Sequence, residues 1–443
     1  MKRLTLEATD RNIFDSIRAD SFCRNADVKE FVEVLDTIEG NMFISLDGKW
    51  GEGKSFYVRQ IEQTLKYITQ KKWNENEPGI VDDIKTYFKN TILDSIELDK
   101  SYLPIYYNAW LYDNHDDPLM SLLLTIIKKS EQYLEIKFSP SVGEKISTLL
   151  SAASLTIGKF QFNIDGDRTK KAIEGKDILE SVKTSEEIRE GVKQILNEVI
   201  VEKAERLIIF IDELDRCKPS FAIEMLERIK HYFDDERIIF VVSVNKEQLV
   251  HTISKYYGMG FDSTGYLNKF FDLNIHMPIL KESSYSLFNT YSNRQTNLRN
   301  IVDGLNDYYK LSIRDALIFK QRTSNLPVNF INDDTTQGYL LSLFVPIIII
   351  LDIKDENEKL KFLSGDGSIL EVFSREIKQI HNMVCRFGGF DRNNQYENGI
   401  KEIKEVYKYI FNNKDIDETT ELLSKLNYNL KRTCIQLCNG FKE

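Results

Sequence analysis

The stretch Gly48-Lys49-Trp50-Gly51-Glu52-Gly53-Lys54-Ser55 lies between an apolar run, Met42–Leu46, and a segment of helical periodicity, Tyr57–Tyr67. It fits the pattern G-x-x-x-x-G-K-[ST], in which a glycine-rich turn connects a strand to a helix. The glycines allow consecutive backbone N–H groups to turn toward an anion, and the N-terminus of the following helix adds the positive end of its dipole. The sequence therefore predicts a phosphate-binding loop.

Two side chains at the end of this loop predict a bound nucleoside triphosphate and its metal. Lys54 can reach the β- and γ-phosphates, and the Ser55 hydroxyl can ligate Mg²⁺. ATP is the expected nucleotide, although these residues leave GTP open. Trp50 is unusual at its position, and we expect its side chain to pack against neighbouring apolar surface. The residues expected to contact the nucleotide are Gly48, Trp50, Gly51, Glu52, Gly53, Lys54, Ser55 and Phe56.

A second landmark is the segment Arg206–Cys217, which reads Arg-Leu-Ile-Ile-Phe-Ile-Asp-Glu-Leu-Asp-Arg-Cys. A short apolar run flanked by charge is typical of a strand buried on both faces of a parallel sheet, and ligands bind at the carboxyl ends of such strands. We expect Asp212 to hold Mg²⁺ and Glu213 to polarise the attacking water. Asp215 lies further from the expected metal. Arg216 pairs with Asp215 or another neighbour, or it reaches a phosphate.

Two further residues are candidates for catalysis. Asn245 follows the apolar strand Ile238–Val244, where it can sense the γ-phosphate and orient the water, or instead cap the helix that follows. Arg314 lies in a helix opened by Ser312, and an arginine supplied from a second domain or subunit can stabilise charge in the transition state. Exposed arginines are common, so an ordinary surface position is the alternative for Arg314.

The remaining strand signals predict an α/β core. Tyr102–Asn108 is rich in aromatic and aliphatic residues, and we expect its pairing to begin after Pro104. Tyr266–Ile275 is interpreted as a helix passing into a last short strand. These elements predict a P-loop NTPase fold with a mainly parallel sheet.

Strand signals cease after Pro278, and helical periodicity takes over. We therefore expect two domains: a P-loop NTPase core over residues 1–280, with an insertion around 138–200, and a helical C-terminal domain over residues 281–443.

Composition indicates a soluble globular protein, with 42% hydrophobic and 29% charged residues. The formal net charge of −10 argues against nucleic-acid binding by bulk charge and leaves only a local basic groove open. The 5 cysteines are scattered, which favours a reducing compartment. Two apolar stretches, Ile146–Ile157 and Leu340–Ile353, fall short of the ~20 residues that a membrane span needs. We expect buried helices there, and a cytoplasmic protein without membrane attachment.

Several segments together resemble the KAP family of P-loop NTPases. Asp47–Ser55 looks like the family's G-x-W-G-x-G-K-[ST] loop, and Asn108-Ala109-Trp110 resembles its N-A-W element after the second strand. Asp212–Cys217 is similar to its D-[DE]-L-D-R-C motif, and Tyr266–Phe271 matches in style. The resemblance covers about residues 15–325. It implies an ATPase core of the additional-strand, catalytic-glutamate type, with the phosphate-loop and acidic residues in the roles given above.

The resemblance also implies partners. Many KAP proteins carry transmembrane helices between the two nucleotide motifs; we expect none here, which indicates the soluble bacterial branch. Members of that branch look like ATPase components of multi-gene antiviral defence systems such as Qat. The implied function is Mg-dependent ATP hydrolysis that drives a conformational change, in a homo-oligomer or a subunit of an antiphage defence complex.

Two other functions stay open. One is a nucleotide-dependent scaffold that assembles with little turnover. The other is phosphoryl transfer to a small substrate, which is the weaker hypothesis because no basic lid-like segment follows the loop.

Overall fold

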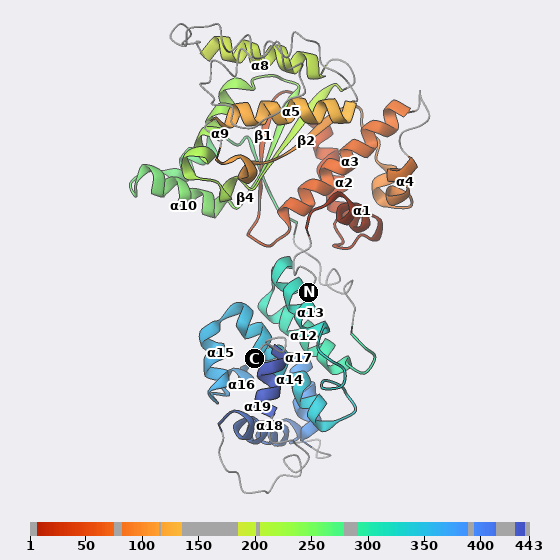
Figure 1. Ribbon diagram of the computed structural model, residues 1–443, viewed down its shortest axis with the longest axis vertical. Helices are drawn as coiled ribbons and strands as arrows, with labels where there is room; N and C mark the ends of the chain where they lie inside the picture. Colours follow the sequence, from red (N-terminus) through yellow and green to blue (C-terminus); the bar gives the residue numbers. More distant parts are fainter. Residues whose placement is uncertain are drawn as a thin grey trace, which may run out of the picture. The chain divides into compact units, whose positions relative to one another are not determined.

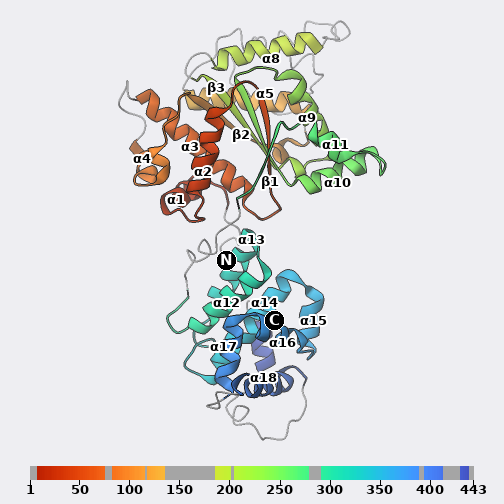
Figure 2. The same cartoon turned by 180° about the vertical axis from the view of Figure 1, so that it is seen from behind.

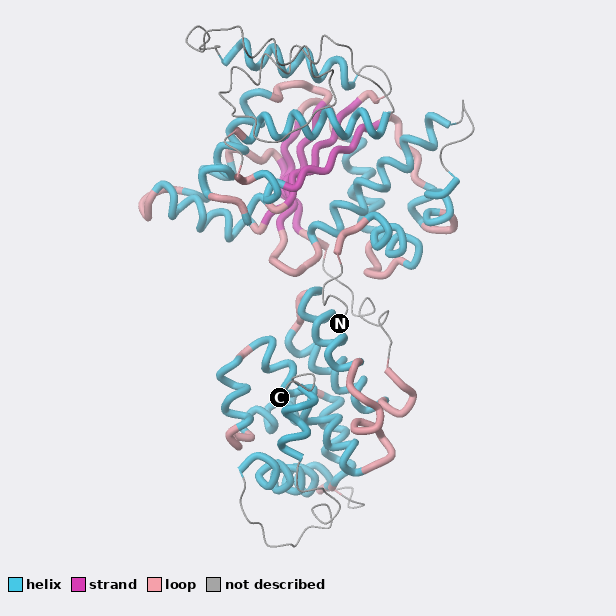
Figure 3. Tube along the Cα trace, viewed as in Figure 1, coloured by secondary structure: helices cyan, strands magenta, loops and turns pink. Residues whose placement is uncertain are grey.

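The computed structural model describes residues 7–74, 82–114, 117–134, 185–200, 204–278, 291–388, 394–412 and 430–438. The chain divides into two compact units, Glu7–Lys281 and Glu282–Glu443. Among the described residues, all strands belong to the first unit, and the second consists of helices and loops (Figure 3). Of the predicted insertion around 138–200, only the part from residue 185 onward includes described residues. Ile146–Ile157 lies outside them.

The first unit is built on a parallel sheet with the strand order β2-β3-β4-β1-β5. Its strands are β1 (Met42–Asp47), β2 (Tyr102–Asn108), β3 (Arg206–Asp212), β4 (Ile238–Val244) and β5 (Leu273–His276). β4 therefore lies between β1, which leads into the phosphate loop, and β3, which leads into the acidic pair. This is the additional strand that the resemblance implied, and the predicted α/β fold class is confirmed.

Helices cover both faces of the sheet, because its central strands are buried on both sides. Leu207, Ile209 and Ile211 of β3 belong to a core shared with α5 (Pro118–Leu134) and α9 (Pro219–Tyr232). Residues that alternate with them point to the opposite face, where α3 (Lys54–Asn74) contacts β2, β3 and β4. Figures 1 and 2 show α5 and α9 on one side of the strands and α3 on the other.

The remaining helices of this unit pack around these layers. α1 and α2 contact α3, α8 contacts α5 and α9, and α10 contacts α9 and α11. Their bounds are α1 (Asp10–Ala19), α2 (Asn25–Thr37), α4 (Asp82–Phe88), α8 (Ser185–Ile200), α10 (Lys246–Tyr257) and α11 (Ser263–Asn268), with short turns η1 (Ile92–Ser95), η2 (Ala109–Tyr112) and η3 (Leu214–Arg216).

The pairing of β2 begins earlier than expected. Tyr102 is opposite Arg206 and Pro104 is opposite Ile208, so the prediction that pairing begins after Pro104 is wrong. β2 is an edge strand. A proline is tolerated in an edge strand because its missing N–H can fall on the unpaired side.

The second unit is helical, as predicted, and packs around α14 (Thr336–Lys354). Every residue of α14 from Leu340 to Leu351 is buried, and α12, α13, α15 and α19 contact this helix. The other helices are α12 (Thr296–Tyr309), α13 (Ile313–Ser324), α15 (Glu356–Leu363), α16 (Ser368–Glu376), α17 (Lys378–Phe387), α18 (Gln395–Asn412) and α19 (Leu430–Cys438). Among the described helices, α14 is the one long and apolar enough to cross a membrane, yet 72% of its most apolar window is buried. Its place is that of a core helix.

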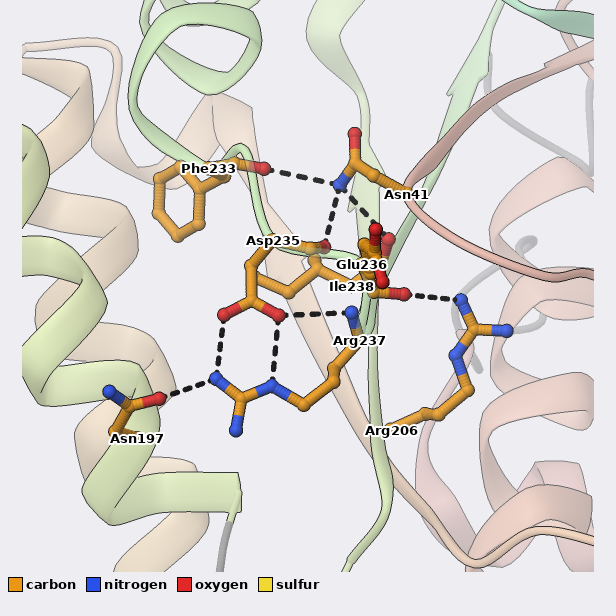
Figure 4. Close-up of polar contacts among 8 residues, drawn as sticks. All are labelled: Asn41, Asn197, Arg206, Phe233, Asp235, Glu236, Arg237 and Ile238. Atoms are coloured by element: carbon orange, nitrogen blue, oxygen red, sulfur yellow. Dashed lines mark hydrogen bonds and ion pairs between the residues drawn. The ribbon is translucent and has the colours of Figure 1, made fainter.

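A polar cluster joins strands at the end of the sheet opposite to the phosphate loop (Figure 4). The side-chain amide of Asn41, just before β1, donates to the carbonyl oxygens of Phe233, Asp235 and Ile238 at 3.1, 3.2 and 3.1 Å. These carbonyls belong to the turn between α9 and β4 and to the first residue of β4. Asn41 therefore holds the amino ends of β1 and β4 at the same level.

Two arginines complete this cluster. The guanidinium of Arg206, which is buried at the start of β3, donates to the backbone carbonyls of Ile38, Gly40 and Glu236. Arg237 donates to both carboxylate oxygens of Asp235 at 2.9 and 2.6 Å. The side-chain hydrogen bond from Arg237 holds the pKa of Asp235 below its ordinary value. At this end of the sheet, side chains thereby donate to the backbone carbonyls of Ile38, Gly40, Phe233, Asp235, Glu236 and Ile238.

We expect Asn41→Asp to destabilise the first unit by about 2–4 kcal/mol, because a carboxylate cannot donate and would face carbonyl oxygens. Urea unfolding followed by tryptophan fluorescence measures the effect, since all 3 tryptophans lie in this unit. Asn114→Asp is the matched control: the side-chain oxygen of Asn114 accepts from Lys218 at 2.8 Å, and a carboxylate keeps that role. Equal stability of the two variants would show that the Asn41 bonds do not hold the strands.

Candidate functional site

The phosphate loop turns sharply because two of its glycines have a left-handed backbone. Gly51 and Gly53 have φ angles of 87° and 79°. Positive φ angles of this size are unfavourable for residues that have a Cβ atom. The N–H of Gly48, directly after β1, donates to the carbonyl of Val244 at 3.1 Å. A Cβ at Gly48 would lie 2.5 Å from Cγ of Met277. The same Cβ would lie 2.9 Å from Oε2 of Glu52, so the loop can begin here only with glycine unless both Met277 and Glu52 move.

Lys54 begins α3 and is only 9% exposed. Its ammonium group donates to the carbonyls of Gly48 at 2.6 Å and Lys49 at 3.3 Å. Burial lowers the pKa of Lys54, and the nearby carboxylates of Asp215 and Asp212 oppose that shift. The ammonium thus lies inside the curve of the loop, with acidic side chains nearby.

Asp212 ends β3 on the face of the sheet that α3 covers, because Ile211 before it belongs to the opposite core. Its side chain is buried, and Oδ2 accepts a hydrogen bond from the Tyr106 hydroxyl at 2.8 Å. Oδ1 is also buried and has no hydrogen-bond partner among the described residues. A buried carboxylate oxygen without a partner is costly, and a cation would satisfy it.

Glu213 follows with a strained backbone. Its φ of 63° and ψ of 22° lie in the left-handed region, which is uncommon for a residue with a side chain and is found at functional sites. Oε1 accepts from the Ser55 hydroxyl at 3.1 Å, and the carboxylate forms an ion pair with Arg216. Burial, aided by Asp212, raises the pKa of Glu213, although Arg216 and Ser55 act in the other direction. A carboxyl group with increased proton affinity suits a general base.

Two tryptophans contact the turn η3 that follows Glu213. The indole N–H of Trp50 donates to Asp215 Oδ2 at 2.5 Å, and the side chain is 49% exposed. The expected packing of Trp50 against apolar surface is therefore wrong, because its polar edge is bound to a carboxylate. The guanidinium carbon of Arg216 lies 5.5 Å from the ring centroid of Trp110. Of the partners expected for Arg216, the structure shows an ion pair with a neighbouring carboxylate, that of Glu213.

Two other predicted nucleotide contacts support the loop from within. The carboxylate of Glu52 accepts from the N–H of Lys49 at 2.8 Å, and its carbonyl accepts from Arg24 at 3.2 Å. The ring of Phe56 is buried and meets that of Phe22 edge to face, with centroids 5.2 Å apart. These side chains fix the shape of the loop.

Asn245 caps α10, because its side-chain oxygen accepts from the N–H of Gln248 at 3.2 Å. The cap alternative is thus present, and the role of Asn245 toward a γ-phosphate stays a prediction. Arg314 is an exposed residue in the first turn of α13, a helix of the unit Glu282–Glu443. Ser312 caps that helix by accepting from the N–H of Asp315 at 3.2 Å. The catalytic role of Arg314 also stays a prediction.

The residues fit a nucleoside triphosphate with Mg²⁺. The glycine turn, Lys54, the Ser55 hydroxyl and the partnerless Asp212 Oδ1 lie around the start of α3. Among the described residues there is no group of three or more His, Cys, Asp or Glu that could hold a metal ion. This agrees with a site in which Mg²⁺ is bound by one or two protein oxygens together with phosphates and water.

Sequence reasoning missed Tyr106. Its hydroxyl bonds Asp212, and the guanidinium carbon of Arg59 lies 4.9 Å from its ring centroid. Tyr106 was assigned to an aromatic strand and nothing more. The available signal was its place two residues before the end of β2, but that signal is usable only once β2 is known to pair with β3.

Comparison with known families agrees with this geometry. The model of the KAP family P-loop domain matches residues 24–317, which is more than half of the 443 residues. No curated protein matches the chain. The matched range contains the phosphate loop, the acidic turn and every strand described above, and the chain therefore belongs to the KAP family of P-loop NTPases.

Proposed function

We propose that the protein is a magnesium-dependent ATP hydrolase. The observation that carries this proposal is the contact between the two motifs: the Ser55 hydroxyl of the phosphate loop donates to Glu213, directly after Asp212, whose Oδ1 is partnerless. A loop that only binds a nucleotide needs no carboxylate beside its serine. A carboxylate there can accept a proton from an attacking water.

The proposed roles follow from position. Lys54 leaves the loop carbonyls to bind phosphate oxygens, and Ser55 and Asp212 hold the metal. Bound Mg²⁺ would neutralise charge on the phosphates. Glu213 accepts the proton from water, Asn245 orients that water, and Arg314, from a second domain or a second subunit, stabilises charge in the transition state. Turnover then drives a conformational change that is passed to the helical unit.

A second candidate function is a nucleotide-dependent scaffold with little turnover. One observation favours it: the Glu213 carboxylate is held by both Ser55 and Arg216. The positive charge of Arg216 stabilises the ionised carboxylate and so opposes the transfer of a proton from water to it. Measured turnover separates the two candidates.

We expect Glu213→Gln to lower the steady-state rate of ATP hydrolysis by roughly 100-fold or more, because the amide cannot act as a base. Binding of ATP with Mg²⁺, measured by calorimetry, should persist. Glu131→Gln, an exposed change on α5, is the control. If wild-type protein shows no turnover, the hydrolase proposal is wrong and the nucleotide-dependent scaffold is the remaining candidate function. If wild-type protein turns over and Glu213→Gln turns over at the same rate, Glu213 is not the base.

We expect Gly48→Ala to weaken ATP binding at least tenfold, because the added Cβ would meet Met277 Cγ at 2.5 Å and displace the start of the loop. The double variant Gly48→Ala with Met277→Ala removes Cγ of Met277, the nearest atom, and leaves Oε2 of Glu52 at 2.9 Å. It should therefore recover part of the affinity, as calorimetry would show. A double variant as weak as Gly48→Ala would place the defect elsewhere than in this contact.

We also propose that the protein acts in the cytoplasm, without membrane attachment, as a homo-oligomer or as a subunit of an antiphage defence complex. Membership of the KAP family and the resemblance of its soluble bacterial branch to defence ATPases support this. Under this proposal, ATP with Mg²⁺ raises the molar mass measured by light scattering above that of one chain, and Lys54→Ala abolishes the increase. A single-chain mass under every condition would contradict self-assembly.

A further inference from the structure

Side chains from three separate segments meet around η3, the turn that follows the acidic pair. Trp50 comes from the phosphate loop, Trp110 from η2, and Asp215 and Arg216 from η3 itself. Trp50 binds the Asp215 carboxylate through its indole N–H, and Arg216 lies over the ring of Trp110. The turn is thus tied to the loop and to the end of β2 at the same time.

Arg216 also acts on Glu213. Its Nε forms an ion pair with Oε2, while the Ser55 hydroxyl donates to Oε1. The carboxylate of Glu213 is thus held by a hydrogen bond at Oε1 and by the charge of Arg216 at Oε2, which is buried and has no hydrogen-bond partner among the described residues. The positive charge of Arg216 beside Oε2 stabilises the ionised carboxylate in this position, so the observed contact opposes the transfer of a proton from water to Glu213.

The contact between Arg216 and Glu213 is suited to be broken. The side chains of Arg216 and Glu213 are 32% and 16% exposed, and a partly solvated ion pair contributes little net stability. The Trp110 ring, itself 51% exposed, gives the guanidinium a second partner after release. Glu213 has a strained backbone, which would favour a change in its position once the ion pair is lost.

We propose that Arg216 is a positioning residue that holds Glu213 out of its catalytic role until ATP and Mg²⁺ bind. This inference rests on the proposed hydrolase function. Ser55 links the ligand to this release: its hydroxyl oxygen would hold the metal while its hydrogen donates to Oε1 of Glu213, and Arg216 is the other contact of the carboxylate. Release of Arg216 frees Oε2 to accept a proton.

The first test compares ATP turnover at saturating ATP and Mg²⁺. Arg216→Met removes the charge and keeps a long side chain, and it should raise kcat by roughly three- to tenfold with KM changed less than twofold. Arg216→Lys keeps the charge without the planar guanidinium, and its kcat should fall between the two. Arg228→Met is the control, since Arg228 lies over Tyr232 at 5.7 Å, on α9. A kcat of Arg216→Met equal to or below that of wild type overturns the proposal.

The second test measures the fluorescence emission of Trp110, first in the nucleotide-free protein and then with ATP and Mg²⁺. The difference between the emission of the wild type and that of Trp110→Phe is the emission of Trp110, whose ring lies next to the guanidinium of Arg216. Without nucleotide, Glu213→Gln and Arg216→Met should both shift this emission, and ATP with Mg²⁺ should shift that of wild type in the same direction as Glu213→Gln. An emission from Trp110 that responds to neither Glu213→Gln nor ATP, in protein shown by calorimetry to bind ATP, overturns the proposal.

The two tests separate failure of the restraint from failure of the enzyme. If wild type turns over and Arg216→Met is slower, the hydrolase stands and the restraint is wrong. If no variant turns over, the hydrolase proposal falls and the restraint on catalysis falls with it; a Trp110 signal that follows ATP binding and the Glu213→Gln change then shows only that the contact of Arg216 with Glu213 responds to the nucleotide.

Discussion

The site depends on the parallel pairing of β3, β4 and β1, because parallel strands bring their carboxyl ends to one edge of the sheet. In this register Asp212 is opposite Ser243, and Ser243 is opposite Leu46, the residue two positions before Gly48. A slip of one residue would turn Asp212 to the other face, away from α3. Asn41 and Arg206 at the opposite edge protect this register, because each binds backbone carbonyls from a neighbouring segment.

The three sequence motifs that carry the family resemblance are one structural unit. The side chain of Asn108 accepts from the N–H of Trp110 and so shapes the turn that holds this ring. Trp50 and Trp110 then contact Asp215 and Arg216, next to the strained Glu213. Tryptophan in a phosphate loop looks out of place in sequence, but here its N–H donates a hydrogen bond to the buried carboxylate of Asp215.

Much of the fold could be predicted because it follows from local patterns. The strand bounds Tyr102–Asn108 and Ile238–Val244 and the helical second unit follow from apolar periodicity and polar joins. The loop and acidic residues follow from motif chemistry. Three features could not be predicted because they depend on strand order and side-chain direction. They are the hydrogen bond from Tyr106 to Asp212, the ion pair between Arg216 and Glu213, and the pairing of β2 at Pro104. The proline is tolerated because β2 is an edge strand.

The central helix α14 has a consequence for shortened forms of the chain. Its length and hydropathy are those of a segment that could insert into a membrane, and the helices packed around it shield it from water. α19 contacts it, and the Cys438 thiol reaches the carbonyl of Val345 at 3.8 Å. A chain truncated before Leu430 would lack α19 and would expose part of the apolar surface of α14. Chaperones, lipid bilayers and other copies of the chain could then bind that surface. By covering α14, the helix α19 therefore also protects the protein against aggregation.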